Sequence, residues 1–229
     1  MALIALLVEG QTERIFLEHL LPCIQLPDRL FISKKLPDVL ENNIHDNKIW
    51  LQDCRGDGSF PSYIKKNQRA FIINNFDKII IVRDYYPANK PPTPLCKGNL
   101  CRSLMNSIPE DVTNRYTNNI LINLSVEEVE AWFFLDRELF GRIDPSLTEQ
   151  FINENFNNIL EINPEDIKHP SSKIIKIFKR GNLGFKYRKH EDEAYAFIDN
   201  LIMDNCINSA NEEYAQSLFR LINILLQIL

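Results

Sequence analysis

The sequence predicts an α/β fold in which a sheet of mostly parallel strands is flanked by helices. Two observations lead to this prediction. Short apolar runs rich in Ile, Val and Leu are typical of strands that are buried on both faces. Between these runs lie amphipathic segments with helical spacing, and strand and helix signals alternate several times.

The elements follow one another in this order along the chain. Strands are predicted at Leu3–Val8, Ile49–Leu51, Ile79–Val82 and Ile120–Leu124. Helices are predicted between them at Thr12–Ile24 and Tyr63–Phe76. The proline-rich stretch Pro87–Pro94 can form neither a helix nor a central strand, so it is expected to be a loop.

The strand signals stop after Ser125, which with Glu128 forms a capping-box pattern that predicts the start of a helix. Helices are predicted from there to the end, at Val126–Leu139, Thr148–Phe156, Ser171–Phe178, Glu191–Met203 and Glu212–Leu229. The chain is therefore predicted to consist of an α/β core, residues 1–140, and a helical C-terminal extension, residues 141–229. The apolar tail Leu218–Leu229 leaves open whether it packs against a second copy in a homodimer or closes the core of its own chain.

The composition excludes several classes of protein. The 229 residues are 45% hydrophobic and 25% charged, which is typical of a globular protein and not of a disordered one. No apolar run approaches the ~20 residues that span a bilayer, so no membrane partner is expected. Five cysteines, an odd number, without a secretion signal favour the reducing cytoplasm. The net charge of −5 argues against a protein that binds DNA through overall positive charge, although it leaves room for a local basic groove.

Acidic residues follow three of the predicted strands. Glu9 comes directly after the first, Asp84 ends the run that begins at Ile79, and a group of acids follows Ile120–Leu124, namely Glu127, Glu128 and Glu130. Because ligands of parallel sheets bind beyond the carboxyl ends of the strands, these side chains are expected to converge. Glu13 lies about one helical turn after Glu9 and is expected to face the same way. The alternative for Glu13, Glu127 and Glu128 is an ordinary acid in the first turn of a helix.

Converging carboxylates suit a hard cation, so the predicted cofactor is Mg²⁺ or Mn²⁺, and the predicted chemistry is phosphodiester cleavage. The predicted metal ligands are Glu9, Asp84, Glu128 and Glu130. The predicted catalytic residues are Glu9, Glu13, Asp84 and Glu130.

A basic strip, residues 168–190, contains eight Lys and Arg side chains and no acid. One interpretation is that it holds nucleic-acid phosphates while Phe185 and Tyr187 stack on bases. The alternative is the wet face of a helix whose Ile174, Ile175 and Phe178 face inward. The predicted nucleic-acid contacts are Lys173, Lys176, Lys179, Arg180, Lys186, Arg188 and Lys189.

Three segments together resemble the Toprim superfamily: LLVEGQTERIFLEHLLP, IIIVRD and EEVEAWFFLD. More narrowly, the chain resembles a bacterial Toprim-like family of unknown function, domain-of-unknown-function family 4276, which is related to the nuclease domain of overcoming-lysogenisation-defect (OLD) proteins. In Toprim domains the first strand ends in Glu-Gly followed by a further acid, which Glu9, Gly10 and Glu13 match. The EVEAW segment of the narrower family is matched by Glu128 and Glu130.

The resemblance implies a Toprim-like sheet and a metal-dependent nuclease that acts in defence against phage or mobile elements. It also implies nucleic acid as the partner, DNA before RNA, and an ATPase partner protein. One position departs from the Toprim pattern, because Tyr86 stands where the second acid of Asp-x-Asp is expected. A phenol with a pKa of about 10 is a poor Mg²⁺ ligand. The departure leaves three alternatives: a single metal, recruitment of Asp136 or Glu128, or a silent module that binds nucleic acid or a partner protein.

Overall fold

The computed structural model describes residues 2–24, 30–44, 47–55, 59–86, 94–188 and 191–228. Its five strands form one sheet in the order β2-β3-β1-β4-β5, and all four neighbouring pairs are parallel. The α/β prediction is therefore confirmed. The strands are β1 (Ala2–Val8), β2 (Leu30–Ser33), β3 (Asn47–Asp53), β4 (Lys78–Tyr85) and β5 (Ile120–Val126). Only β2 was not predicted, because it is a half-buried edge strand of four residues without a long apolar run.

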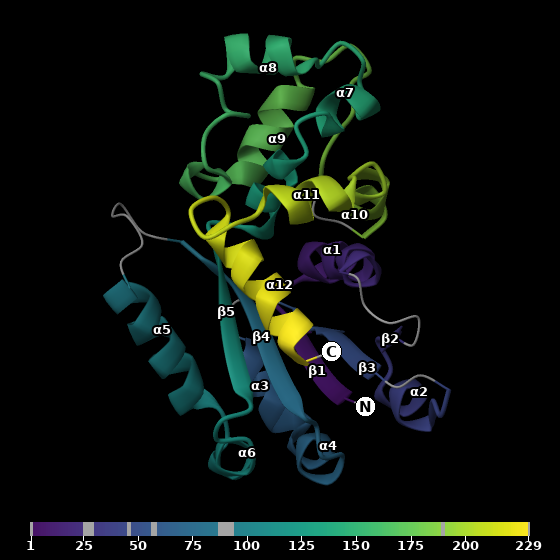
Figure 1. Cartoon of the computed structure of the whole chain (residues 1–229), viewed down its shortest axis with the longest axis vertical. Coiled ribbons are helices and arrows are strands. Elements are labelled where there is room, and N and C mark those ends of the chain that lie inside the picture. The colour runs from purple at the N-terminus through teal and green to yellow at the C-terminus, as the bar shows by residue number, and fades with distance from the viewer. Residues whose placement is uncertain are drawn as a thin grey trace.

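Helices cover both faces of the sheet, which explains why the strands are apolar throughout (Figure 1). In β1, Ile4 and Leu6 pack toward one face, whereas Ala5 and Leu7 pack toward the other. The first face is covered by α1 (Gln11–Leu20) and α12 (Gln216–Ile228). The second face is covered by α2 (Leu36–Glu41), α3 (Ser59–Lys66), α4 (Gln68–Ile73), α5 (Pro94–Ser107) and α6 (Glu110–Arg115).

The remaining helices lie beyond the carboxyl ends of β4 and β5 (Figure 1). They are α7 (Leu139–Ile143), α8 (Glu149–Asn155), α9 (Pro170–Phe178), α10 (Glu191–Ile198) and α11 (Met203–Ser209). The part of the chain that the structure describes also contains the 3₁₀ helices η1 (Leu21–Cys23), η2 (Val129–Leu135) and η3 (Pro164–Asp166). Their apolar side chains join those of α1 and the first sheet face in one hydrophobic core. The division of the chain at residue 140 stays a prediction.

The helix predicted from Val126 is wrong in its start and its type. Ser125 does not cap a helix, because it lies inside β5, fully buried, opposite Asp84 of β4. The strand continues to Val126, and Glu127 then turns the chain with a φ of 67°. The helix that follows is the 3₁₀ helix η2, whose N-cap Glu128 makes no side-chain capping bond. Strand pairing with β4 thus overrides the local capping signal.

Other boundaries also differ from those predicted. The segment Tyr63–Phe76 is split into two helices at Asn67, and α10 ends at Ile198 before α11 begins. Pro94 begins α5, and residues 87–93 of the proline-rich stretch lie outside the described residues. Within the described ranges, no helix is long and apolar enough to cross a membrane.

Gly181, just after α9, packs against the carboxylate of Asp144, which is itself held by several donors. The backbone N–H groups of Ser146 and Leu183 donate to Asp144, as does the hydroxyl of Ser146. These bonds lower the pKa of Asp144 and fix its position. A Cβ atom at Gly181 would overlap the Asp144 Oδ2 atom.

The substitution Gly181→Ala is therefore expected to lower the free energy of unfolding by about 1–3 kcal/mol, because it overpacks a fixed contact. Urea unfolding followed by circular dichroism measures this change in the free energy of unfolding. Gly98→Ala is the matched control, because an added Cβ meets no atom there within 4 Å. Equal changes in the free energy of unfolding of Gly181→Ala and Gly98→Ala would contradict the close contact between Gly181 and Asp144.

Candidate active site at the carboxyl edge of the sheet

The predicted acids do meet at one edge of the sheet, and they are all buried. Glu9 follows β1, and Asp84 is the penultimate residue of the neighbouring strand β4. Glu127 and Glu128 follow β5, and Glu130 lies in η2. Their exposed fractions are 8% or less, and that of Glu130 is 0%. The strand order changes direction between β1 and β4, which is where α/β sheets commonly bind ligands.

Glu9 holds the end of β4 in place. Its Oε2 atom accepts a hydrogen bond of 3.2 Å from the backbone N–H of Asp84. The Nε atom of Arg83 lies 4.0 Å from the same oxygen and brings positive charge to it. Glu9 therefore connects the ends of two strands as well as adding an acid to the edge.

Tyr86 lies between two of the carboxylates. Its hydroxyl oxygen is 3.4 Å from Asp84 Oδ2 and 3.2 Å from Glu128 Oε1. Tyr86 is 45% exposed, but partial removal of its hydroxyl from water, together with the charges of Asp84, Glu128 and Glu130, raises its pKa. The phenol therefore keeps its single proton at neutral pH, and it can donate that proton to only one carboxylate at a time.

The N-terminus of α9 supports the acids that follow β5. The backbone N–H of Ser171 donates to Glu128 Oε2 at 2.9 Å. The Lys168 ammonium donates to Glu127 Oε1 at 2.6 Å, and the N–H of His169 lies 3.4 Å from Glu127 Oε2. Free N–H groups and the helix dipole both favour negative charge at this end of a helix. Glu127 is thus committed to an ion pair, whereas Glu128 faces both α9 and Tyr86.

Glu13 and Glu130 lie around a second tyrosine, Tyr187. The Tyr187 hydroxyl donates to Glu130 Oε1 at 2.8 Å. Burial and the charge of Glu130, with a smaller contribution from Glu13, raise the pKa of Tyr187, while a hydrogen bond with Thr12 lowers it. Glu130 also contributes to the raised pKa of Tyr86, so its charge acts on both tyrosines.

The predicted metal ligands do not form a ready three-residue group. Among the described residues, no three His, Cys, Asp or Glu side chains are arranged to hold a metal ion. Glu9 instead accepts from the Asp84 backbone, and Glu130 accepts from Tyr187. Asp84 and Glu128 are the pair that a single group, the Tyr86 hydroxyl, bridges. Mg²⁺ is commonly bound through one or two protein carboxylates while water and phosphate complete its shell, so Asp84 and Glu128 are the candidate ligands.

In the basic strip, most of the described Lys and Arg side chains are exposed, whereas several of its apolar and aromatic side chains are buried. The exposed members are Lys176, Lys179, Arg180, Lys186 and Arg188, Lys173 is half-buried, and Lys189 lies outside the described residues. The aromatic interpretation is wrong for Tyr187, and for Phe185 it stays a prediction. Tyr187 is only 3% exposed, so its ring is not free to stack on a base. Phe185 is half-buried, and its ring centroid lies 4.7 Å from that of Phe178. Ile175 is 37% exposed and does not face inward as expected.

Sequence reasoning missed the contacts that hold the acids. Ser171 is 43 residues from Glu128, and Tyr187 is 57 residues from Glu130. Pro170 at the first position of α9 signals the start of a helix, but nothing in the sequence shows what that start faces.

A family model described as "Domain of unknown function (DUF4276)" matches residues 8–209. No curated protein and no solved structure matches the chain.

Proposed function

The chain belongs to the DUF4276 family, whose function is unknown, and from its site we propose that it is a divalent-cation-dependent nuclease. It would hydrolyse nucleic-acid phosphodiesters, DNA before RNA. The observation that carries the proposal is the burial of carboxylates from three strand ends at one edge, with two of them bridged by Tyr86. Several buried charges of one sign are costly to fold, and a cation bound among them offsets that cost.

In this proposal Asp84 and Glu128 hold Mg²⁺ or Mn²⁺, with Glu9 and Glu130 as further ligand candidates. When bound, such an ion polarises the phosphate and lowers the pKa of a bound water. Glu9 positions Asp84 through the backbone of β4, and the N-terminus of α9 orients Glu128. Each of these contacts limits the freedom of a carboxylate before any ligand arrives.

Lys173 comes two residues after Ser171, which contacts Glu128; Lys176 follows in α9, and Lys179 is the C-cap of that helix. Lys173, Lys176 and Lys179 would neutralise phosphates that the acidic edge otherwise repels. Lys168 already forms an ion pair with Glu127, so its proposed role is to position that carboxylate and not to bind phosphate. The Toprim resemblance of the VEGQTE and EVEAW motifs supports a relationship to OLD nucleases, and with it a defence role and an ATPase partner.

A cleavage assay tests the proposal. Purified protein is incubated with single- and double-stranded DNA and RNA in Mg²⁺, in Mn²⁺ and in EDTA. We expect cleavage that needs the divalent ion, that is lost in Glu128→Gln, and that persists in the exposed control Glu41→Gln. Cleavage that survives Glu128→Gln would point to another site or to contamination.

The second candidate is a catalytically silent module that binds nucleic acid or a partner protein. Tyr86 favours it, because the hydroxyl already fills the space between Asp84 and Glu128. Under this alternative, no substrate is cleaved in any metal. Salt-sensitive binding of DNA would nevertheless remain.

The two candidates differ in what Tyr86→Phe does. Without a divalent ion, loss of the donor leaves two carboxylates facing each other, and we expect the free energy of unfolding to fall by about 1 kcal/mol. If the ion binds between Asp84 and Glu128, saturating Mn²⁺ takes the place of the Tyr86 hydroxyl and returns the free energy of unfolding of Tyr86→Phe to the wild-type value. Thermal unfolding with and without Mn²⁺ measures both effects. Tyr63→Phe is the control, and an equal response to Mn²⁺ in both variants would count against ion binding at Asp84 and Glu128.

A further inference from the structure

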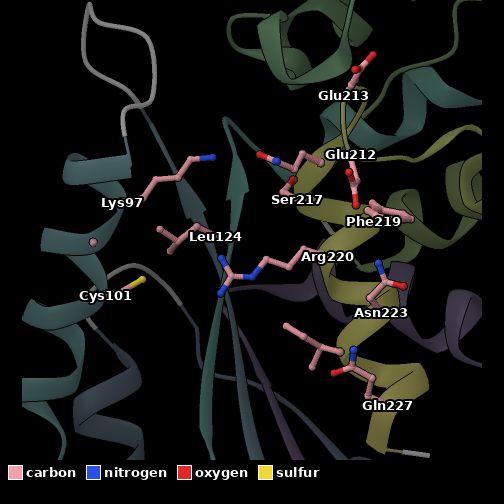
Figure 2. A pocket seen from close by; sticks show the side chains of 13 residues that line it. Lys97, Cys101, Leu124, Glu212, Glu213, Ser217, Phe219, Arg220, Asn223 and Gln227 are labelled. Carbon is pink, nitrogen blue, oxygen red and sulfur yellow. The ribbon is translucent and has the colours of Figure 1, made fainter.

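A groove runs between α5 and α12 on the outer side of the edge strand β5 (Figure 2). Its volume is about 960 Å³, and Leu124 of β5 contributes to its floor. Ligand sites in proteins have volumes of ~300–1,000 Å³, so the groove has room for a small organic molecule. None of the acids at the carboxyl edge of the sheet lines it.

Two cations reach into the groove from opposite walls. Lys97 extends from α5, and Arg220 extends from α12 (Figure 2). The Arg220 side chain points from α12 toward the wall that carries Cys101 (Figure 2). Neither cation makes a hydrogen bond or an ion pair with any residue that the structure describes. The acids Glu212 and Glu213 also line the groove, at the end where α12 begins (Figure 2).

The rest of the lining combines amides with apolar surface. Asn223 and Gln227 lie on the same wall as Arg220, and each amide offers both donors and acceptors. Leu124, Phe219 and Ile224 contribute apolar surface. A matching ligand therefore carries an anionic group beside a flat, polar-edged ring.

We propose that this groove binds a nucleotide, with its phosphate between Lys97 and Arg220. Arg and phosphate form charge-assisted, two-pronged hydrogen bonds, which suits the guanidinium of Arg220. The base lies against the apolar surface and hydrogen-bonds the amides of Asn223 and Gln227. The nucleotide is either free or one unit of a single strand, and the experiment below separates the two sources.

Gly98 keeps the α5 wall open. It lies inside α5, where glycine costs about 1 kcal/mol relative to alanine, and an added Cβ would meet no atom within 4 Å. A larger side chain at this position would enter the groove without straining the fold. Gly98→Leu is therefore a blocking variant that is expected to be at least as stable as the wild type.

The proposal does not depend on the proposed nuclease activity, so the two can fail separately. To keep them separate, binding is measured in EDTA. The readout is alkylation of Cys101, which lies on the α5 wall one helical turn after Lys97 and opposite Arg220, followed by peptide mass spectrometry. Cys23 is exposed and does not line the groove, so its alkylation is the internal control.

We expect a mononucleotide or a short single-stranded oligonucleotide to slow alkylation of Cys101 and leave Cys23 unchanged. Protection by the mononucleotide identifies a free nucleotide, and protection by the oligonucleotide alone identifies a unit of a strand. Arg220→Gln is expected to lower the affinity for the protecting ligand about tenfold, which corresponds to the loss of one charged hydrogen bond. Gly98→Leu abolishes protection, whereas the exposed control Arg69→Gln retains it.

Three results would overturn the proposal. The first is the absence of protection by either probe at millimolar concentration. The second is equal protection by inorganic phosphate alone, which would leave no role for a base. The third is unchanged protection in both Arg220→Gln and Gly98→Leu, which would place the ligand elsewhere.

Discussion

Replacement of Trp132 by alanine is expected to lower the free energy of unfolding by about 3–5 kcal/mol, because Trp132 is the largest fully buried side chain among the described residues. The centroid of the Trp132 ring lies 5.4 Å from the centroid of the Phe16 ring in α1. Its Nε1–H donates to the Ser217 hydroxyl in α12 at 3.1 Å. A single side chain of η2 thus joins the two helices that cover one face of the sheet, and its loss also leaves Ser217 without this donor.

Trp132→Phe separates packing from hydrogen bonding. Phenylalanine keeps most of the ring contact with Phe16 but cannot donate to Ser217, so a smaller loss of about 1–2 kcal/mol is expected. Urea unfolding followed by far-ultraviolet circular dichroism measures both variants. A loss below 1 kcal/mol in Trp132→Ala would contradict this role for η2.

The second large effect concerns activity. Asp84→Asn is expected to reduce metal-dependent cleavage by about 10²–10³-fold, since a ligand charge supplies several kcal/mol to the stabilisation of a phosphodiester transition state. The amide has the same shape as the carboxylate and can still accept from Tyr86, so the fold should remain. Removal of a negative charge should leave nucleic-acid binding unchanged or stronger.

Asp53→Asn is the matched control, because Asp53 is also an acid at the end of a parallel strand, β3. Its Oδ1 atom accepts from the backbone N–H of Arg55, which indicates a role in the turn. Cleavage in this variant should equal that of the wild type. A similar loss in both variants would show that charge at the sheet edge matters in general and that Asp84 has no particular role.

The sequence was sufficient to predict the convergence of the acids, because it depends only on strand order and direction. Runs such as Ile79–Val82 identify buried parallel strands, and parallel strands end at a common edge. Glu9, Asp84 and Glu128 could therefore be placed together without any long-range information.

The partners of these acids could not be predicted, because they come from segments distant in the chain. The start of α9 contacts Glu128, and Tyr187 contacts Glu130, across dozens of residues. The capping pattern of Ser125 failed for a related reason, since pairing with β4 extends the strand past it. Local signals were correct where the neighbouring elements agreed with them, as at Thr148, whose hydroxyl caps α8.

The most direct test of the acidic edge is a calorimetric titration with Mn²⁺ of the wild type and of the double variant Asp84→Asn/Glu128→Gln. We expect saturable binding in the wild type and an affinity at least tenfold lower in the double variant, a difference of about 1.4 kcal/mol or more. An absence of saturable binding in the wild type, or equal affinity in both proteins, would mean that these carboxylates hold no divalent ion.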